Sequence, residues 1–177
     1  MINSIKKELE LFVRNILNEY ITNSNVFEFD EKDYPEIFDL KSGIGIIVKH
    51  NNEIIGEACH ITMDRTFLLN LRDMLLMVIK GDSKKNMPDP EQIKNMTFEL
   101  FLTERIKAVK SIDNIDVSKQ GLIIQQLGKT AFRLPEKTKK TNVEIITELI
   151  EKTGCKVDKK DFSGFLIFSF SVEKFVF

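Results

Sequence analysis

Cys59 and His60 are neighbouring residues whose side chains are of the types used in nucleophilic catalysis. A cysteine nucleophile needs an imidazole within hydrogen-bond reach to take its proton. Successive residues of a β-strand point to opposite faces, so a strand over these two positions would separate the thiol from the ring. We therefore interpret Cys59 as a small buried hydrophobic residue and His60 as a strand-end or capping residue.

Glu57 lies two residues before Cys59 and would share a face with it in a strand. A carboxylate beside a thiol could hold a cation or a substrate amine, although a solvated carboxylate is the simpler interpretation. His50, Glu57, His60 and Asp64 are all suitable metal-ligand types, and a metal site needs three or four convergent ligands. His50 and Glu57 do not face each other in the hairpin described below, so no metal site is predicted. The chain also lacks a P-loop, a GxGxxG and a GxSxG motif, so no cofactor is predicted.

The composition is that of an ordinary globular protein, with 177 residues of which 42% are hydrophobic and 30% charged. The 26 basic residues are balanced by 27 acidic ones, which argues against a general nucleic-acid-binding surface. Two isolated cysteines without a signal-type apolar segment are typical of a reduced, cytoplasmic protein. The longest apolar run, 74–79, is far short of the roughly 20 residues that span a bilayer, so no membrane association is expected.

The first half of the chain predicts a helix, a connection and a hairpin. Apolar residues at three- and four-residue spacing predict an amphipathic helix over 5–21, followed by an irregular connection over 22–42 with one short helix. Asn51 and Asn52 tolerate the positive φ angles of a two-residue type I′ turn. This turn pairs His50 with Glu53 and Ile46 with Glu57. The segment 1–42 is expected to pack on the core, or else on another chain.

The remaining segments complete an α+β pattern. A nearly all-apolar helix is predicted from a cap at Asp64 or Thr66 to Lys80, and a short helix after Asp89. Strands are expected over 97–103, 121–126 and 130–134, then a helix starting at a Thr141 capping box and ending before Gly154, then a last strand from about Gly164. This order predicts a mainly antiparallel sheet packed with helices, with 43–177 forming one domain.

Most of the chain resembles a known family. Gly121–Ile124 followed by Gly128–Pro135 is similar to a Gly-Leu-Ile-Ile segment and the Gly-Arg-Ser-Gly-Leu-Phe-Leu-Pro turn of the AMME chromosomal region family, the AMMECR domain. The helix end at Lys152–Gly154 and the Phe-rich last strand also resemble that family. The resemblance covers roughly residues 43–177 and implies an AMMECR-domain-like fold.

The departures from the family concern the segments near its proposed functional cleft. Where the family has Leu-Arg-Gly-Cys-Ile-Gly, this chain keeps the glycine as Gly56 and has Ile55 and Glu57 in place of the arginine and the cysteine. The family's next segment, Asp-Pro-Arg-Phe, keeps its aspartate as Asp82. The resemblance therefore implies a candidate cleft made of Gly56, Glu57, Cys59, His60 and Asp82.

Two hypotheses for function follow from these residues. The first is a binding or accessory module for an unknown ligand, because no complete catalytic set is present. The second is an enzyme in which Glu57 and Asp82 act as acid–base or orienting groups on a small molecule. The resemblance implies a protein partner of the radical SAM or Memo type in either case. A homodimer is left open, as is whether the protein is catalytic.

Overall fold

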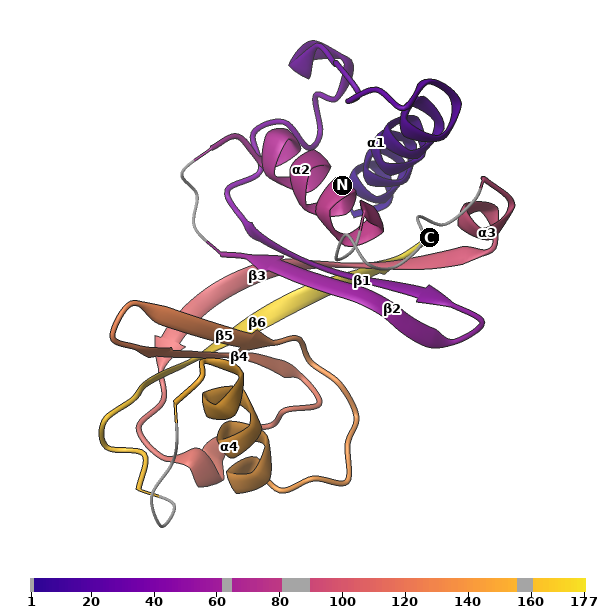
Figure 1. Ribbon diagram of the computed structural model, residues 1–177. Helices are drawn as coiled ribbons and strands as arrows, with labels where there is room; N and C mark the ends of the chain where they lie inside the picture. Colours follow the sequence, from indigo (N-terminus) through magenta and orange to yellow (C-terminus); the bar gives the residue numbers. More distant parts are fainter. Residues whose placement is uncertain (1, 62–64, 81–89, 156–160) are drawn as a thin grey trace. The chain divides into compact units, whose positions relative to one another are not determined.

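The computed structural model describes residues 2–61, 65–80, 90–155 and 161–177, which form helices and a six-stranded sheet (Figure 1). In chain order the elements are α1 (Ile2–Asn23), η1 (Glu31–Asp33), β1 (Gly43–His50), β2 (Glu53–His60), α2 (Phe67–Lys80), α3 (Pro90–Lys94), β3 (Met96–Ala108), η2 (Ile112–Asn114), β4 (Gln120–Gln126), β5 (Lys129–Arg133), α4 (Asn142–Lys152) and β6 (Leu166–Val176). The strand order is β2-β1-β3-β6-β4-β5. The predicted α+β class with a mainly antiparallel sheet is confirmed.

The chain divides into two compact units. Unit 1 comprises Met1–Leu102 together with Lys174–Phe177, and unit 2 comprises Thr103–Glu173. The chain passes from one unit to the other within β3 and again within β6. The boundary placed after residue 42 from the sequence stays a prediction. In the part of the chain that the structure describes, no helix is both long and apolar enough to cross a membrane.

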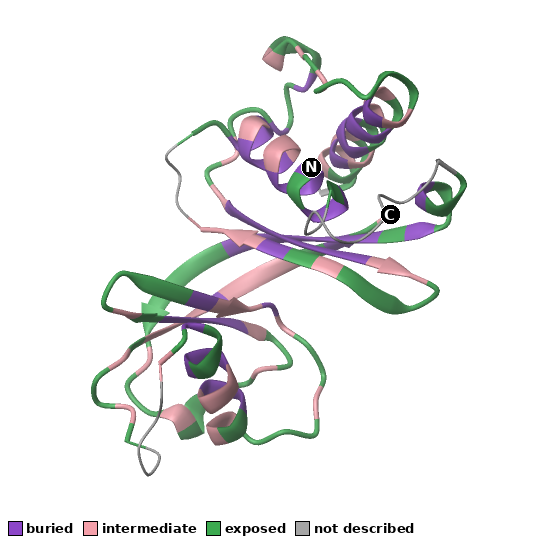
Figure 2. Ribbon diagram, viewed as in Figure 1, coloured by how far each residue is buried: buried purple, intermediate pink, exposed green. Residues whose placement is uncertain are grey.

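The core of unit 1 lies between the helices α1 and α2 and one face of the strands. The apolar stripe of α1, with Leu9, Phe12 and Ile16, has no exposed surface, and Figure 2 shows this stripe in purple along the helix. It packs with Leu68 and Leu71 of α2 in the same hydrophobic cluster. The predicted helix over 5–21 is thus confirmed, and it extends a few residues further at each end.

The predicted hairpin is present, but its register shifts in the middle. Asn51 and Asn52 have φ angles of 52° and 67°, and His50 pairs with Glu53 as expected. Glu57 lies opposite Ile47, however, and not opposite Ile46. The expectation was wrong because β2 contains a β-bulge: Lys49 pairs with Ile54 and Val48 pairs with Gly56, which leaves one residue without a partner.

Gly56 is a point at which β2 and α2 approach each other closely. A Cβ atom at this position would lie 2.8 Å from Cγ1 of Val78 and 3.2 Å from its carbonyl oxygen. A residue without a side chain therefore lets the helix lie directly on the strand. Gly56 therefore has a packing role in this chain.

Unit 2 has a smaller core of its own, in which α4 packs on β4 and β5. Thr141 and Glu144 form the predicted capping box, and the helix is followed by Gly154 at a φ of 76°. Any side chain at Gly121 of β4 would overlap the ring of Phe170 on β6. Both Phe170 and Phe175 of β6 are buried, although strict alternation along a strand would point residues five positions apart to opposite faces. The reason is that β6 contributes to unit 2 up to Glu173 and to unit 1 beyond it.

Candidate functional site

The candidate residues of β2 are divided between the two faces of the strand. Ala58 is buried in the core that contains α2, so Glu57 and Cys59 lie on the opposite face. Their partners on β1 are Ile47 and Gly45. Because successive residues of a strand point to opposite faces, His60 lies on the face that the helices cover. The strand thus brings Glu57 and Cys59 together and separates both from His60.

Cys59 is a protonated thiol at neutral pH. Burial of the side chain, reinforced by the negative charge of Glu57, raises the pKa of Cys59 to about 12. Because the thiolate is the nucleophilic and metal-binding form, this thiol is unsuited to either role. By exposed surface Cys59 is half-buried, and its interpretation as a small structural side chain stays a prediction.

The other candidate residues differ from Cys59 in exposure. Glu57 is exposed and His60 is half-buried, and both have interaction partners within the chain. Asp82 lies outside the described residues, as does Asp64. Within the described ranges, no group of three or more His, Cys, Asp or Glu side chains could hold a metal ion.

A charged cluster that the sequence did not predict lies on the same face of the strands as Glu57 and Cys59. Glu99 of β3 is only 8% exposed, and its two carboxylate oxygens each contact a lysine. Oε1 lies 2.8 Å from Nζ of Lys49 on β1, and Oε2 lies 3.0 Å from Nζ of Lys174 on β6. Lys49 alternates with the helix-side residue Val48, so it shares the face of Glu57. We name these three residues the Glu99 cluster.

The Glu99 cluster holds a carboxylate in its charged form. Burial alone would raise the pKa of Glu99, but the hydrogen bonds and positive charges of Lys49 and Lys174 outweigh it, and the pKa is lowered. Lys174 also lies 5.4 Å from the centre of the buried Phe101 ring. Two half-exposed lysines around one carboxylate leave the cluster with a net positive charge. The sequence signal was an acid between the apolar residues Phe98 and Leu100, at a position that alternates out of the core.

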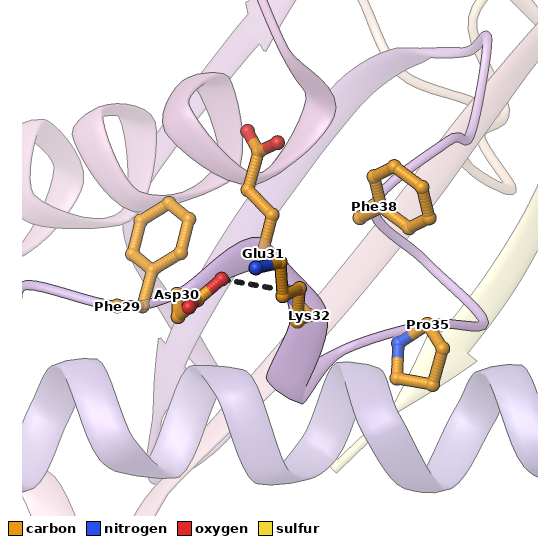
Figure 3. A pocket seen from close by; sticks show the side chains of 6 residues that line it. All are labelled: Phe29, Asp30, Glu31, Lys32, Pro35 and Phe38. Carbon is orange, nitrogen blue, oxygen red and sulfur yellow. Dashed lines mark hydrogen bonds between the residues drawn. The ribbon is translucent and has the colours of Figure 1, made fainter.

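A separate hollow lies in the segment between α1 and β1. It has a volume of about 820 Å³ and is lined by Phe29, Asp30, Glu31, Lys32, Pro35 and Phe38. In Figure 3 the side chain of Glu31 extends between the rings of Phe29 and Phe38. We name this hollow the Phe38 pocket. Sequence analysis treated 22–42 as a connection and did not predict it.

Contacts with α1 hold the segment that lines the Phe38 pocket in place. Tyr34 is buried, its ring packs edge-to-face on Phe12 at 4.8 Å, and its hydroxyl accepts a hydrogen bond from Asn15. The Asp30 carboxylate accepts a hydrogen bond from the backbone N–H of Lys32 and so caps η1. A loop held at several points keeps its shape without a ligand, so this pocket is pre-formed.

Comparison with known proteins identifies the class to which this fold belongs. The model of the AMMECR1 family matches residues 11–175, so the chain is a member of the AMMECR1 family. The "Uncharacterized Protein PH0010 From Pyrococcus horikoshii" is similar in structure, with a TM-score of 0.83 over 98% of this chain and 91% of that one. Its sequence identity is 18%, so the likeness is one of fold. The chain matches none of the curated proteins with which it was compared.

Proposed function

We propose that this AMMECR1-family chain is a binding or accessory module that contacts a protein partner through the face of the strands carrying Glu57 and the Glu99 cluster. The observation that carries the proposal is that β2 places Cys59 and His60 on opposite faces, and burial, which raises the pKa of Cys59, agrees with it. A thiol that is held protonated is a poor nucleophile, because the thiolate is the reactive form. The charged groups on the same face as Cys59 are of the kind that contact the surface of another protein.

The charges on this face favour recognition over catalysis. Glu57 is exposed, while Lys49 and Lys174 retain 28% and 43% exposure of their side chains. Charges of both signs at fixed positions give orientation and specificity to a protein interface. Because Glu99 holds both lysines, their positions are set before a partner arrives.

The partner class comes from the family resemblance, which implies a radical SAM protein or a Memo-type protein. The alternative is an enzyme that acts on a small molecule together with such a partner, with Glu57 in an acid–base role. A homodimer would use the same face twice. The following experiment separates these three outcomes.

The experiment measures the association of the purified chain with a radical SAM protein and with a Memo-type protein by isothermal titration calorimetry. The test variant is Glu57→Ala, and the matched control is Glu53→Ala, an exposed carboxylate of the same strand that pairs with His50. We expect Glu57→Ala to weaken binding about tenfold, or about 1.4 kcal/mol, and Glu53→Ala to leave it within twofold.

Catalysis is then tested in the same mixtures by following small-molecule turnover. Loss of turnover in Cys59→Ala, with fold and partner binding retained, would contradict the proposal and favour the enzyme. Failure of both partners to bind, together with sedimentation of the chain as a dimer that Glu57→Ala dissociates, would replace the hetero-partner with a second copy.

A further inference from the structure

The Glu99 cluster is part of a row of side chains that crosses four neighbouring strands. The strands β2, β1, β3 and β6 are adjacent in the sheet. Ile54 of β2 lies opposite Lys49 of β1, and residues directly opposite each other on paired strands share a face. The contacts of Glu99 with Lys49 and Lys174 continue the row across β3 and β6. All four residues belong to unit 1.

The two lysines keep hydrogen-bond donors that Glu99 does not use. An ammonium group has three N–H donors, and each lysine makes one contact with the carboxylate of Glu99. Among the described residues, Glu99 is the one acidic side chain within ion-pair distance of either lysine. The side chains of Lys49 and Lys174 are 28% and 43% exposed, so an added group can reach these donors from solvent.

The charges of the row alternate and end with a cation on each side. Lys49, Glu99 and Lys174 follow one another as positive, negative and positive, on strands that are about 4.8 Å apart. A second carboxylate that bridges the two ammonium groups would complete an arrangement in which every charge has opposite charges as its nearest neighbours. Hydrogen bonds between ionised groups are also stronger than those between neutral groups. The cluster is therefore complementary to a carboxylate.

Glu57 lies beside this row and not within it. Its partner on β1 is Ile47, two positions before Lys49, so the two charged positions are about 7 Å apart along the strand. The face thus presents an acid and a pair of bases at a set spacing. A complementary surface carries a base and an acid at the same spacing, and matching both signs fixes the orientation of a partner.

Ile54 adds apolar surface at the end of the row. Its side chain is 47% exposed, although it lies next to Lys49 on a neighbouring strand. Apolar surface beside polar contacts is the usual composition of a protein interface. The group that reaches the lysines is therefore best accompanied by an apolar neighbour.

From these observations we infer that the partner protein places the carboxylate of an aspartate or glutamate between Lys49 and Lys174, and packs an apolar side chain on Ile54. The inference rests on the proposed function for the existence of a partner. It adds the chemistry by which this face recognises that partner.

The first experiment uses the partner titrations described above, with Lys49→Gln and Lys174→Gln as test variants. We expect each variant to weaken binding about tenfold, and Lys174→Arg, which keeps the charge, to stay within about threefold of the wild type. The matched control is Lys94→Gln, which removes an exposed lysine of α3 that pairs with Glu91 at 3.6 Å and should change binding less than about twofold. Melting temperatures show whether a variant that loses binding has kept its fold.

The second experiment needs no partner and uses acetate as the probe. Acetate replaces chloride at constant ionic strength, and the ε-methylene signals of isotope-labelled lysines are followed by NMR. We expect the signals of Lys49 and Lys174 to shift at least about threefold more than that of Lys94, because two ammonium groups can bind one carboxylate together. In Lys174→Gln the response of Lys49 should fall to that of Lys94.

The outcomes separate this inference from the proposed function. Unchanged partner binding in both glutamine variants, with weakened binding in Glu57→Ala, would overturn the inference and leave the proposed function standing. Acetate shifts at Lys49 and Lys174 equal to that of Lys94 would also overturn it, whether or not a partner binds. Failure of every partner to bind, together with the expected acetate response, would contradict the proposed function and support the carboxylate site.

Discussion

The carboxylate of Glu57 and the thiol of Cys59 lie on the same face of β2, and the charge of Glu57 adds to burial in keeping the thiol protonated. This relationship is the reverse of the one in catalytic cysteine sites, where a nearby cation lowers the thiol pKa. The charge of Glu57 therefore works against formation of the Cys59 thiolate.

The raised pKa of Cys59 predicts a specific pH dependence of stability. A thiol with a pKa of about 12 when folded and about 8.5 when unfolded contributes stability that is fully present below pH 8.5 and is lost as the pH rises toward 12. Between pH 8.5 and 10 the unfolding free energy should fall by up to about 1.4 kcal/mol per pH unit because of this group. Denaturation in urea should show that slope in the wild type, and Cys59→Ala should lack it. Identical slopes in both proteins would contradict the assignment.

Glu99 has the opposite pH dependence. Because its pKa is lowered by Lys49 and Lys174, its contribution to stability is present above the unfolded pKa of about 4.3 and is lost as the pH falls through the folded pKa. Glu99→Gln should cost about 1–2 kcal/mol at pH 7, since it leaves two partly buried lysines without a counter-charge, and it should weaken the acid sensitivity. The control is Glu104→Gln, an exposed carboxylate of the same strand. Equal losses in the two variants would show that the Glu99 cluster has no special role.

The contact between Gly56 and Val78 predicts a steric effect. Gly56→Ala should destabilise the protein by about 1–3 kcal/mol, because the new methyl group would displace α2 from β2. Gly164→Ala is the matched control, since its Cβ would meet only the flexible end of Gln126 at 3.4 Å and should change stability by less than about 0.5 kcal/mol. The melting temperatures of the two variants, compared with that of the wild type, test this prediction. A Gly56→Ala protein as stable as the control would mean that the helix moves away without cost.

A substitution in the turn between β4 and β5 should raise the stability of the protein. Leu127 has a φ of 49° and is 91% exposed, followed by Gly128 at a φ of 77°. These are the angles of a type I′ turn, which favours Asn-Gly. Leu127→Asn should therefore stabilise the protein by about 0.5–1 kcal/mol. The midpoint of urea denaturation measures this gain, and a destabilised variant would show that Leu127 has a packing role.

Local rules explain the parts of the fold that could be predicted from the sequence. The Asn51-Asn52 turn and the Thr141–Glu144 capping box depend on residues within a few positions of each other, and both are present. The bulge in β2 was not predictable in this way, because the turn rules fix only the pairs next to the turn. It arises where Gly56 lies against α2.

The Glu99 cluster and the Phe38 pocket were harder to predict because they join distant segments. The Glu99 cluster joins three strands, and Lys174 lies 75 positions after Glu99 in the numbering. The Phe38 pocket exists because Tyr34 packs on Phe12 of α1, a contact that no local pattern specifies. For Cys59 the sequence did indicate separation from His60, since strand alternation is local. The predicted cleft as a whole stays a prediction, and Asp82 lies outside the described residues.

The most direct test of the central claim is the pH dependence of alkylation at Cys59, read separately from Cys155 by mass spectrometry in the folded and urea-unfolded protein. At pH 8 a thiol with a pKa of about 12 has roughly a thousandfold less thiolate than a free cysteine, so folded Cys59 should label about a thousandfold more slowly than in urea. Labelling within tenfold of the unfolded rate, with an apparent pKa at or below 8.5, would reveal an activated thiol and contradict the account of this chain as a binding module.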